Sequence, residues 1–250
     1  MKRVLPTDRI AAAAAQLRKA KRVVALTGAG ISVDSGIPAF RGSQGLWEHY
    51  DPQEYAHIDA FISNPRKVWR MLAEMLALVY DARPNPAHLA LSAMEANGLL
   101  QAVVTQNVDG LHQAAGSKRV VEFHGNTRNL TCLSCNHREA IASFAELNIP
   151  PLCPRCQMVM KPDVVFFGEA IPPAAQSSAV LAASQADLML VIGTSAVVYP
   201  VADLPWVTKR NGGTIVEINL EPSPLTKTVA DVVLLGSASD IMPALVAGLA

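Results

Sequence analysis

Short runs of consecutive apolar residues alternate along the chain with longer segments of helical character. Runs of β-branched and aliphatic residues without polar interruption are typical of strands buried on both faces of a parallel sheet. Alternation of strands and helices on this scale predicts an α/β fold, a doubly wound parallel sheet of the Rossmann-like type. The predicted strands are 22–27, 100–105, 120–123, 188–192, 214–218 and 231–235, and the predicted helices are 7–20, 64–80, 86–97, 172–183 and 239–249. Ser239, with Asp240, is expected to begin the last helix by accepting free amide protons.

Two segments interrupt the alternation. Residues 126–162 are polar and contain prolines and all the cysteines, so they are expected to form a small inserted module. Residues 31–60 are rich in Gly, Pro and aromatic residues and are too long for an ordinary βα connection, which predicts a functional lid. The expected organisation of the chain 1–250 is a large domain of 1–30, 86–125 and 163–250, a lid of about 31–60 with a helical part 61–85, and a small module of about 126–162.

Composition excludes some classes of protein. With 250 residues, half of them apolar, the chain suffices for one large domain, or for a large domain with a small one inserted. Its 21 basic and 21 acidic residues argue against a general polyanion binder. The longest apolar runs are far shorter than the roughly 20 residues of a membrane span, and the first residues do not form a signal peptide pattern. A cytoplasmic protein with no membrane partner is expected.

The four cysteines form two pairs, Cys132 with Cys135 and Cys153 with Cys156, with seventeen residues between the pairs. Two such knuckles at this separation match one tetrahedral zinc site. The alternative is two separate redox pairs, but neither pair follows a strand and opens a helix as a thioredoxin-like motif does. The pattern predicts a structural zinc ribbon and says little about function.

Glycines follow the first predicted strand directly, at Gly28 and Gly30, where the backbone can approach a pyrophosphate closely. The third glycine of the usual dinucleotide fingerprint is absent, with Val33 in its place, so a glycine turn without function is the alternative for this segment. Two later segments favour a nucleotide site, because small and polar groups at the carboxyl ends of parallel strands face the binding crevice. These segments are Gly193-Thr194-Ser195 and Asn219-Leu220-Glu221.

Two further polar clusters follow apolar strands, Gln106-Asn107-Val108-Asp109 and His124-Gly125-Asn126. A lone histidine is usually structural, but the position of His124 at a strand end among such groups indicates a functional residue. A histidine near its unperturbed pKa of about 6.5 suits a general base. His112, within the following helical turn, is expected to be structural.

Together these motifs resemble the sirtuin family, over about residues 20 to 240 and in the family's order. The matching segments are Gly28-Ala29-Gly30-Ile31-Ser32, Gly36-Ile37-Pro38-Ala39-Phe40-Arg41-Gly42, Thr105-Gln106-Asn107-Val108-Asp109, His124-Gly125, the two cysteine pairs, 161–169 and Gly193-Thr194-Ser195.

The resemblance implies an NAD-dependent protein-lysine deacylase that transfers the acyl group to ADP-ribose and releases nicotinamide. NAD would be the co-substrate and one zinc ion would be structural. His124 would deprotonate a ribose hydroxyl, Asn107 would order the ribose hydroxyls or a water, and Asp109 would hydrogen-bond the nicotinamide amide. Phe40 would cover the reacting carbon, and Arg41 would hold the lid and phosphates unless it is simply a solvated loop charge. The full set of expected NAD contacts is Gly28, Ala29, Gly30, Ser32, Phe40, Arg41, Gln106, Asn107, Val108, Asp109, Gly193, Thr194, Ser195, Asn219, Leu220, Glu221 and Ala238.

On the substrate side, the resemblance implies that an acyl-lysine peptide lies as an added strand between segments 165–169 and 196–199. The expected contacts are Val165, Phe167, Gly168, Glu169 and Val197, although half of these apolar residues could equally be core. Acyl-lysine proteins or peptides would be the partners, with no specific nucleic acid.

Leu72 and Met75 stand where the sirtuins that remove succinyl groups carry a Tyr and an Arg, if the helix aligns without a gap. Neither side chain can pair with a carboxylate, and burying an unpaired carboxylate is costly. We therefore expect an apolar acyl pocket for acetyl and longer fatty acyl groups, but not for succinyl. Ala39, where many members carry an acidic residue, removes no obligatory catalytic group.

Two rival functions remain open at this point. The first is an NAD glycohydrolase or ADP-ribosyltransferase, in which water or a protein side chain takes the ribose carbon. The second is a non-enzymatic binding module built on the zinc ribbon, which carries Arg128, Arg138, Arg155 and Lys161 but no interleaved aromatic residues.

Overall fold

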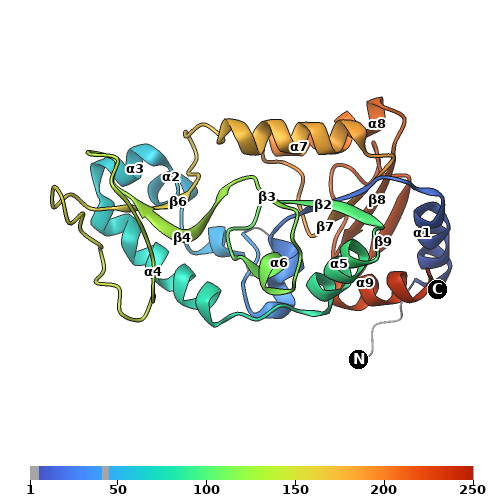
Figure 1. Ribbon diagram of the computed structural model, residues 1–250, viewed down its shortest axis with the longest axis horizontal. Coiled ribbons are helices and arrows are strands. Elements are labelled where there is room, and N and C mark those ends of the chain that lie inside the picture. Colours follow the sequence, from blue (N-terminus) through green and yellow to red (C-terminus); the bar gives the residue numbers. More distant parts are fainter. Residues whose placement is uncertain (1–5, 41–44, 250) are drawn as a thin grey trace.

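The computed structural model describes residues 6–40 and 45–249. The molecule is elongated, with a large lobe built on a parallel sheet and a small lobe at one end (Figure 1). The strands of the large lobe are β1 (Val23–Thr27), β2 (Leu100–Thr105), β3 (Val120–Glu122), β7 (Leu188–Ile192), β8 (Thr214–Asn219) and β9 (Val232–Leu235).

The strands of the large sheet are parallel and follow the order β3-β2-β1-β7-β8-β9. β1 and β7 are buried along their whole length, which agrees with the uninterrupted apolar runs that predicted them. Chain order reverses between β1 and β7, and ligands of such sheets bind at this switch point, outside the carboxyl ends of the strands. The doubly wound fold predicted from the sequence is therefore confirmed.

Helices cover both faces of this sheet (Figure 1). α1 (Thr7–Lys19), α5 (Pro86–Ala96) and α9 (Ala238–Ala247) share one hydrophobic core with the sheet, and α7 (Pro173–Gln185) and α8 (Leu204–Arg210) share the other. The predicted helix 239–249 begins one residue late, and its predicted capping residue is wrong by two positions. Ser237, not Ser239, accepts the hydrogen bond at the start of α9, since its hydroxyl receives the amide of Ser239.

The small lobe combines an antiparallel sheet with helices from the earlier part of the chain. Its strands are β4 (Gly125–Thr131), β5 (Arg138–Ala140) and β6 (Lys161–Val164), in the order β5-β4-β6. Trp69 of α4 (Pro65–Asp81) is fully buried, and its indole N–H donates to the carbonyl of Met160, the residue before β6, at 2.8 Å. The remaining helices and helical turns are η1 (Ala29–Ser35), η2 (Leu46–Glu48), α2 (Pro52–Tyr55), α3 (Ile58–Ser63), α4 (Pro65–Asp81), α6 (Leu111–Ala114) and η3 (Val201–Asp203).

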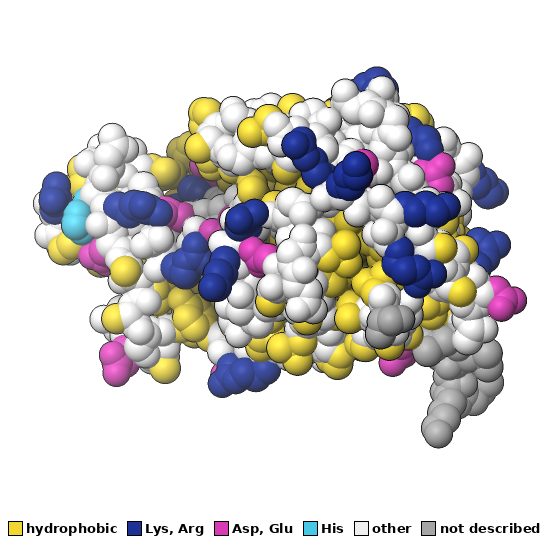
Figure 2. All heavy atoms as spheres, turned by 45° about the vertical axis from the view of Figure 1, so that its right-hand side comes forward, with side chains coloured by type: hydrophobic (Ala, Val, Ile, Leu, Met, Phe, Trp, Pro, Cys, Tyr) yellow, Lys and Arg dark blue, Asp and Glu magenta, His cyan; other side chains and the backbone are white. Residues whose placement is uncertain are grey.

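The surface carries charges of both signs. On the face shown in Figure 2, Lys and Arg side chains stand in separate groups with uncharged surface between them. Among the described residues, no helix is long and apolar enough to cross a membrane.

Candidate active site and zinc centre

Backbone segments meet closely where β1 and β7 end. The amide of Gly30 donates to the carbonyl of Gly193 at 2.8 Å. A Cβ atom on Gly30 would lie only 2.7 Å from the Cα atom of Gly193, so a side chain at Gly30 would force these two segments apart. Gly193 itself has a φ of +61°, a conformation that favours glycine. Two segments predicted to contact NAD, the one predicted to approach its pyrophosphate and the one after β7, thus form one tight junction.

A cavity of about 740 Å³ opens beside this junction and extends between the two lobes. Every strand of the large sheet contributes its carboxyl end or the segment after it. Of the residues predicted to contact NAD, the cavity is lined by Gly28, Ala29, Gly30, Phe40, Gln106, Asn107, Val108, Gly193, Thr194, Ser195, Asn219, Leu220, Glu221 and Ala238. Arg41 lies outside the described residues.

His124 follows β3 and lines the cavity. Its Nδ1 atom lies 3.2 Å from the carbonyl oxygen of Gln106, and because a carbonyl only accepts, Nδ1 carries the proton. The Nε2 atom is therefore left unprotonated and able to accept a proton. Burial lowers the pKa of His124, and the hydrogen bond to Gln106 opposes that shift. This corrects the expectation of an unperturbed imidazole, in the direction that keeps the base neutral.

Ser32 and Asp109 line a second, adjoining cavity of about 100 Å³ rather than the main one. The hydroxyl of Ser32 donates to Asp109 at 2.7 Å and accepts from the amide group of Asn107 at 3.1 Å. Burial raises the pKa of Asp109, whereas hydrogen bonds from the Leu111 amide, Ser32 and Asn107 oppose the rise. Asn107 lines both cavities, so the three predicted residues form one connected polar network at the boundary between them.

Asn219, at the end of β8, is held in place on two sides. Its amide group donates to the carbonyl of Thr194 at 3.1 Å and to the carboxylate of Glu217 at 2.9 Å. Glu217 is fully buried and also accepts from the hydroxyls of Ser223 and Thr226. This carboxylate fixes the loop that carries Glu221 along the cavity, a role that the sequence analysis missed because the residue lies within a strand.

The wall of the cavity formed by α4 is apolar. Leu72 and Met75 line it as predicted, and Met71 joins them from the same helix face. Phe40 stacks on Trp47 with ring centroids 5.2 Å apart, and both rings line the cavity. Among the described residues that line it, the charged side chains are Glu169 and Glu221, which are both acidic.

The segment after β6 forms one edge of the cavity. The amide of Val165 donates to the carbonyl of His124 at 2.9 Å, which joins this edge directly to the candidate base. The backbone of Phe167 is hydrogen-bonded to the lid region. Its amide donates to the carbonyl of Ala56, and its carbonyl accepts from the amide of Ile58. The segment after β7 also lines the cavity, through residues that include Val197. The predicted substrate residues Val165, Phe167, Gly168, Glu169 and Val197 all line the cavity.

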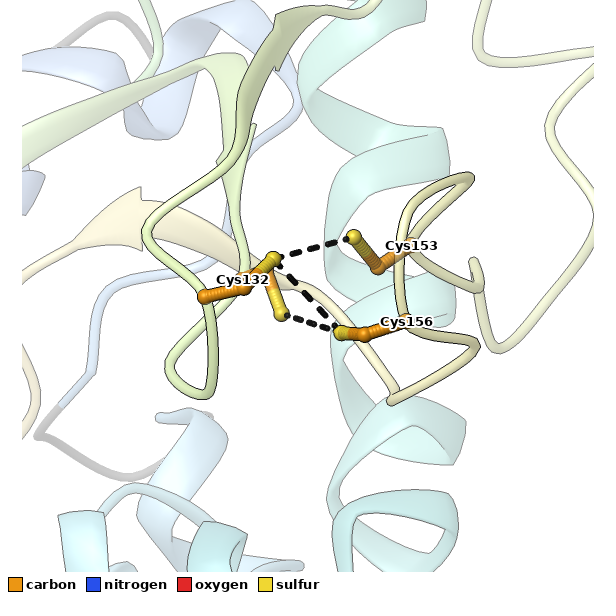
Figure 3. A group of neighbouring side chains, drawn as sticks. Cys132, Cys153 and Cys156 are labelled. Atoms are coloured by element: carbon orange, nitrogen blue, oxygen red, sulfur yellow. Dashed lines mark hydrogen bonds between the residues drawn. The ribbon is translucent and has the colours of Figure 1, made fainter.

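The four cysteines converge in the small lobe. Their sulfur atoms all lie within 4.8 Å of one another. Separations of 3.5 Å for Cys132–Cys156 and for Cys135–Cys153 suit a tetrahedral ion, since Zn–S bonds of about 2.3 Å place sulfurs about 3.8 Å apart. Figure 3 shows Cys132 on one loop facing Cys153 and Cys156 on the other. The donor set and its geometry fit structural zinc, as predicted.

Other lining residues were not singled out from the sequence. Pro38, Trp47, Met71, Ser223 and Pro224 line the main cavity. Met71 could have been found from its place one turn before Met75 on the helix face. The remaining residues lie in loops or, for Trp47, in the single short turn η2, where no periodic pattern shows which side chains turn inward.

Comparisons with known proteins agree with this geometry. Residues 28–200 match the model of the Sir2 family. An NAD-dependent protein deacylase of Pyrococcus furiosus is 46% identical over 235 residues, covering 92% of this chain and 94% of that protein. The crystal structure of a Sir2 homologue–NAD complex superposes with a TM-score of 0.88 at 43% identity, covering 94% of this chain and 92% of that one. A Sir2 variant with a deacetylated p53 peptide and 3′-O-acetyl ADP-ribose superposes with a TM-score of 0.88 at 37% identity, covering 95% and 98%. The chain belongs to the Sir2 family of NAD-dependent protein deacylases.

Proposed function

We propose that this protein removes uncharged acyl groups, acetyl above all, from lysine side chains and transfers them to the ADP-ribose part of NAD. The observation that carries the proposal is the placement of His124, whose Nδ1 proton is held by Gln106 so that Nε2 is free to accept a proton at the cavity. A neutral imidazole beside a nucleotide cavity suits proton abstraction from a ribose hydroxyl.

NAD would occupy the main cavity, supplying the electrophilic ribose carbon and the leaving nicotinamide. The junction of Gly30 with Gly193 would let the backbone approach the phosphates, and the segment around Asn219 would hold the adenosine end. Asn107 and Asp109 would bind the nicotinamide ribose and the amide. Phe40, stacked on Trp47, would exclude water from the reacting carbon.

The charge of the cavity supports the choice of acyl group. The described residues that line it offer no cation to pair with a succinyl carboxylate, and burying that carboxylate without a partner would be costly. The apolar wall of Met71, Leu72 and Met75 would stabilise a hydrocarbon chain by burying it.

A panel of acetyl-, butyryl-, myristoyl- and succinyl-lysine peptides, assayed with and without NAD, tests the proposal. We expect acetyl removal that depends on NAD, with acylated ADP-ribose formed in equal amount to nicotinamide. Formation of free ADP-ribose alone would instead indicate a glycohydrolase. Preferred removal of succinyl would show that the roles given to Leu72 and Met75 are wrong.

A further inference from the structure

Lys161 is buried, with 5% of its surface exposed, although lysine is rarely found inside a protein. It begins β6 and pairs through its backbone with Thr131, next to the zinc-binding Cys132. Its ammonium turns toward the segment that follows it, from Pro162 to Glu169.

Each hydrogen-bond partner of the Lys161 ammonium belongs to that one segment. Nζ donates to the carbonyl of Val164 at 2.6 Å and to the carbonyl of Pro162 at 3.2 Å. It also lies 3.0 Å from a carboxylate oxygen of Glu169 and 4.6 Å from the centre of the Phe166 ring. A single buried cation therefore holds the start, the middle and the end of the segment together.

Glu169 completes the arrangement. The carboxylate oxygen that meets Lys161 also accepts the amide of Phe166 at 2.8 Å, and the Glu169 amide donates to the Phe166 carbonyl at 3.0 Å. Between these anchors, Val165 and Phe167 turn their backbone toward His124 and toward the lid region. Beyond the end of β6, the shape of this edge of the cavity thus depends on the ion pair between buried Lys161 and half-buried Glu169 rather than on a regular strand.

We infer that Lys161 is a positioning residue for the acyl-lysine peptide. It acts by fixing residues 164–169, the edge to which the peptide would add as a strand, and it contacts neither NAD nor the reacting atoms. This inference rests on the proposed function, since it assumes that residues 165–168 bind the peptide. If Lys161 served only the stability of the fold, its replacement would weaken NAD binding and peptide binding alike.

The test replaces Lys161 by methionine, which keeps the length of the side chain and removes the charge. Binding of a fluorescently labelled acetyl-lysine peptide is measured by anisotropy, NAD binding by calorimetric titration, and zinc by metal analysis. For Lys161→Met we expect peptide affinity to fall about 10- to 100-fold, as for a buried ion pair that loses one partner. NAD affinity should stay within about twofold, and one zinc should remain bound. The peptide KM should rise in parallel, and Lys161→Arg should recover part of the loss.

Lys209→Met is the matched control, because Lys209 forms an ion pair with Asp231 that is exposed and lies far from this edge. It should leave peptide affinity unchanged. If Lys161→Met does not fold, Lys161→Gln takes its place, since it removes the charge and keeps a group that can donate to the carbonyls of the segment; a selective loss of peptide affinity is again expected.

Unchanged peptide affinity in a folded Lys161→Met or Lys161→Gln variant would overturn the inference, as would an equal loss of NAD and peptide affinity. A wild-type protein that binds the peptide but does not deacylate it with NAD would contradict the proposed function and leave the inference standing. Absence of peptide binding by the wild type would overturn both.

Discussion

The Nδ1 atom of His124 donates to the carbonyl oxygen of Gln106, 3.2 Å away, so the backbone at the end of β2 sets the tautomer of a side chain that follows β3. The side chain of Gln106 is not needed for this contact, since it donates to the Thr194 hydroxyl at 2.9 Å. The orientation of the His124 ring is therefore set by a backbone carbonyl at the end of the sheet and does not depend on another side chain.

Because burial lowers the pKa of His124 below its ordinary value of 6.5, the base form should persist into mildly acidic solution. We expect kcat/KM for an acetyl-lysine peptide to be flat near pH 7 and to fall only as pH drops through the lowered pKa. His124→Ala should lower kcat by about 10²- to 10⁴-fold. A pH profile at saturating NAD checks the first point; an acid limb above pH 6.5 would contradict it.

The two buried histidines near the site predict how stability depends on pH. Burial lowers the pKa of His88 to about 4 and that of His112 to about 3, and the rings lie 4.9 Å apart. Unfolding exposes both rings to water, where they take up protons below pH 6.5. Stability contributed by the neutral rings is present above that pH and is lost as pH falls toward the folded pKa values, by about 1.4 kcal/mol per pH unit for each ring.

His112→Gln should therefore flatten the decline of stability between pH 6 and 4, as measured by urea unfolding at a series of pH values. Gln can keep a hydrogen bond to the Thr27 hydroxyl, which His112 contacts at 2.9 Å. His49→Gln is the control, because His49 is exposed and meets water in both states. A slope unchanged by His112→Gln would show that this histidine does not control acid stability.

The acyl pocket can be altered at one position. Met75→Arg would place a cation among the apolar side chains that line the cavity, where a succinyl carboxylate would reach. The ratio of kcat/KM for succinyl over acetyl peptide should rise about tenfold, the worth of one charge-assisted hydrogen bond. Ala77→Arg, on the exposed side of the same helix, should leave the ratio unchanged. An unaltered ratio in the Met75 variant would place the acyl group elsewhere.

Removal of zinc should destabilise the small lobe as a whole. Cys132 and Cys153 are buried in the same core cluster as Leu130, Met160 and Trp69, so the metal and this core form together. A strong chelator should release one zinc per chain, lower the melting temperature and abolish deacylation. Cys135→Ser should do the same and Ser134→Ala should not, with zinc content and calorimetry as the measurements. A metal-free protein that kept its melting temperature would show that the site is not structural.

The sequence by itself determined the strands of the large sheet and their order along the chain, together with most of the long helices. The apolar runs at 22–27 and 188–192 became β1 and β7 within a residue, because a strand buried on both faces needs a continuous apolar sequence. It also determined the zinc ligands, because a pair of cysteines two residues apart turns both thiolates toward one ion whatever the rest of the chain does.

Only the tertiary structure decided which distant residues meet. Ser32 and Asp109 are 77 residues apart, yet they form one hydrogen bond, and the carbonyl that orients His124 belongs to a neighbouring strand. The charge of Lys161 was visible in the sequence as a basic residue of the small module, but not its burial against Glu169. Periodicity is a local property of the chain, whereas such contacts depend on how sheet, lid and small lobe pack together.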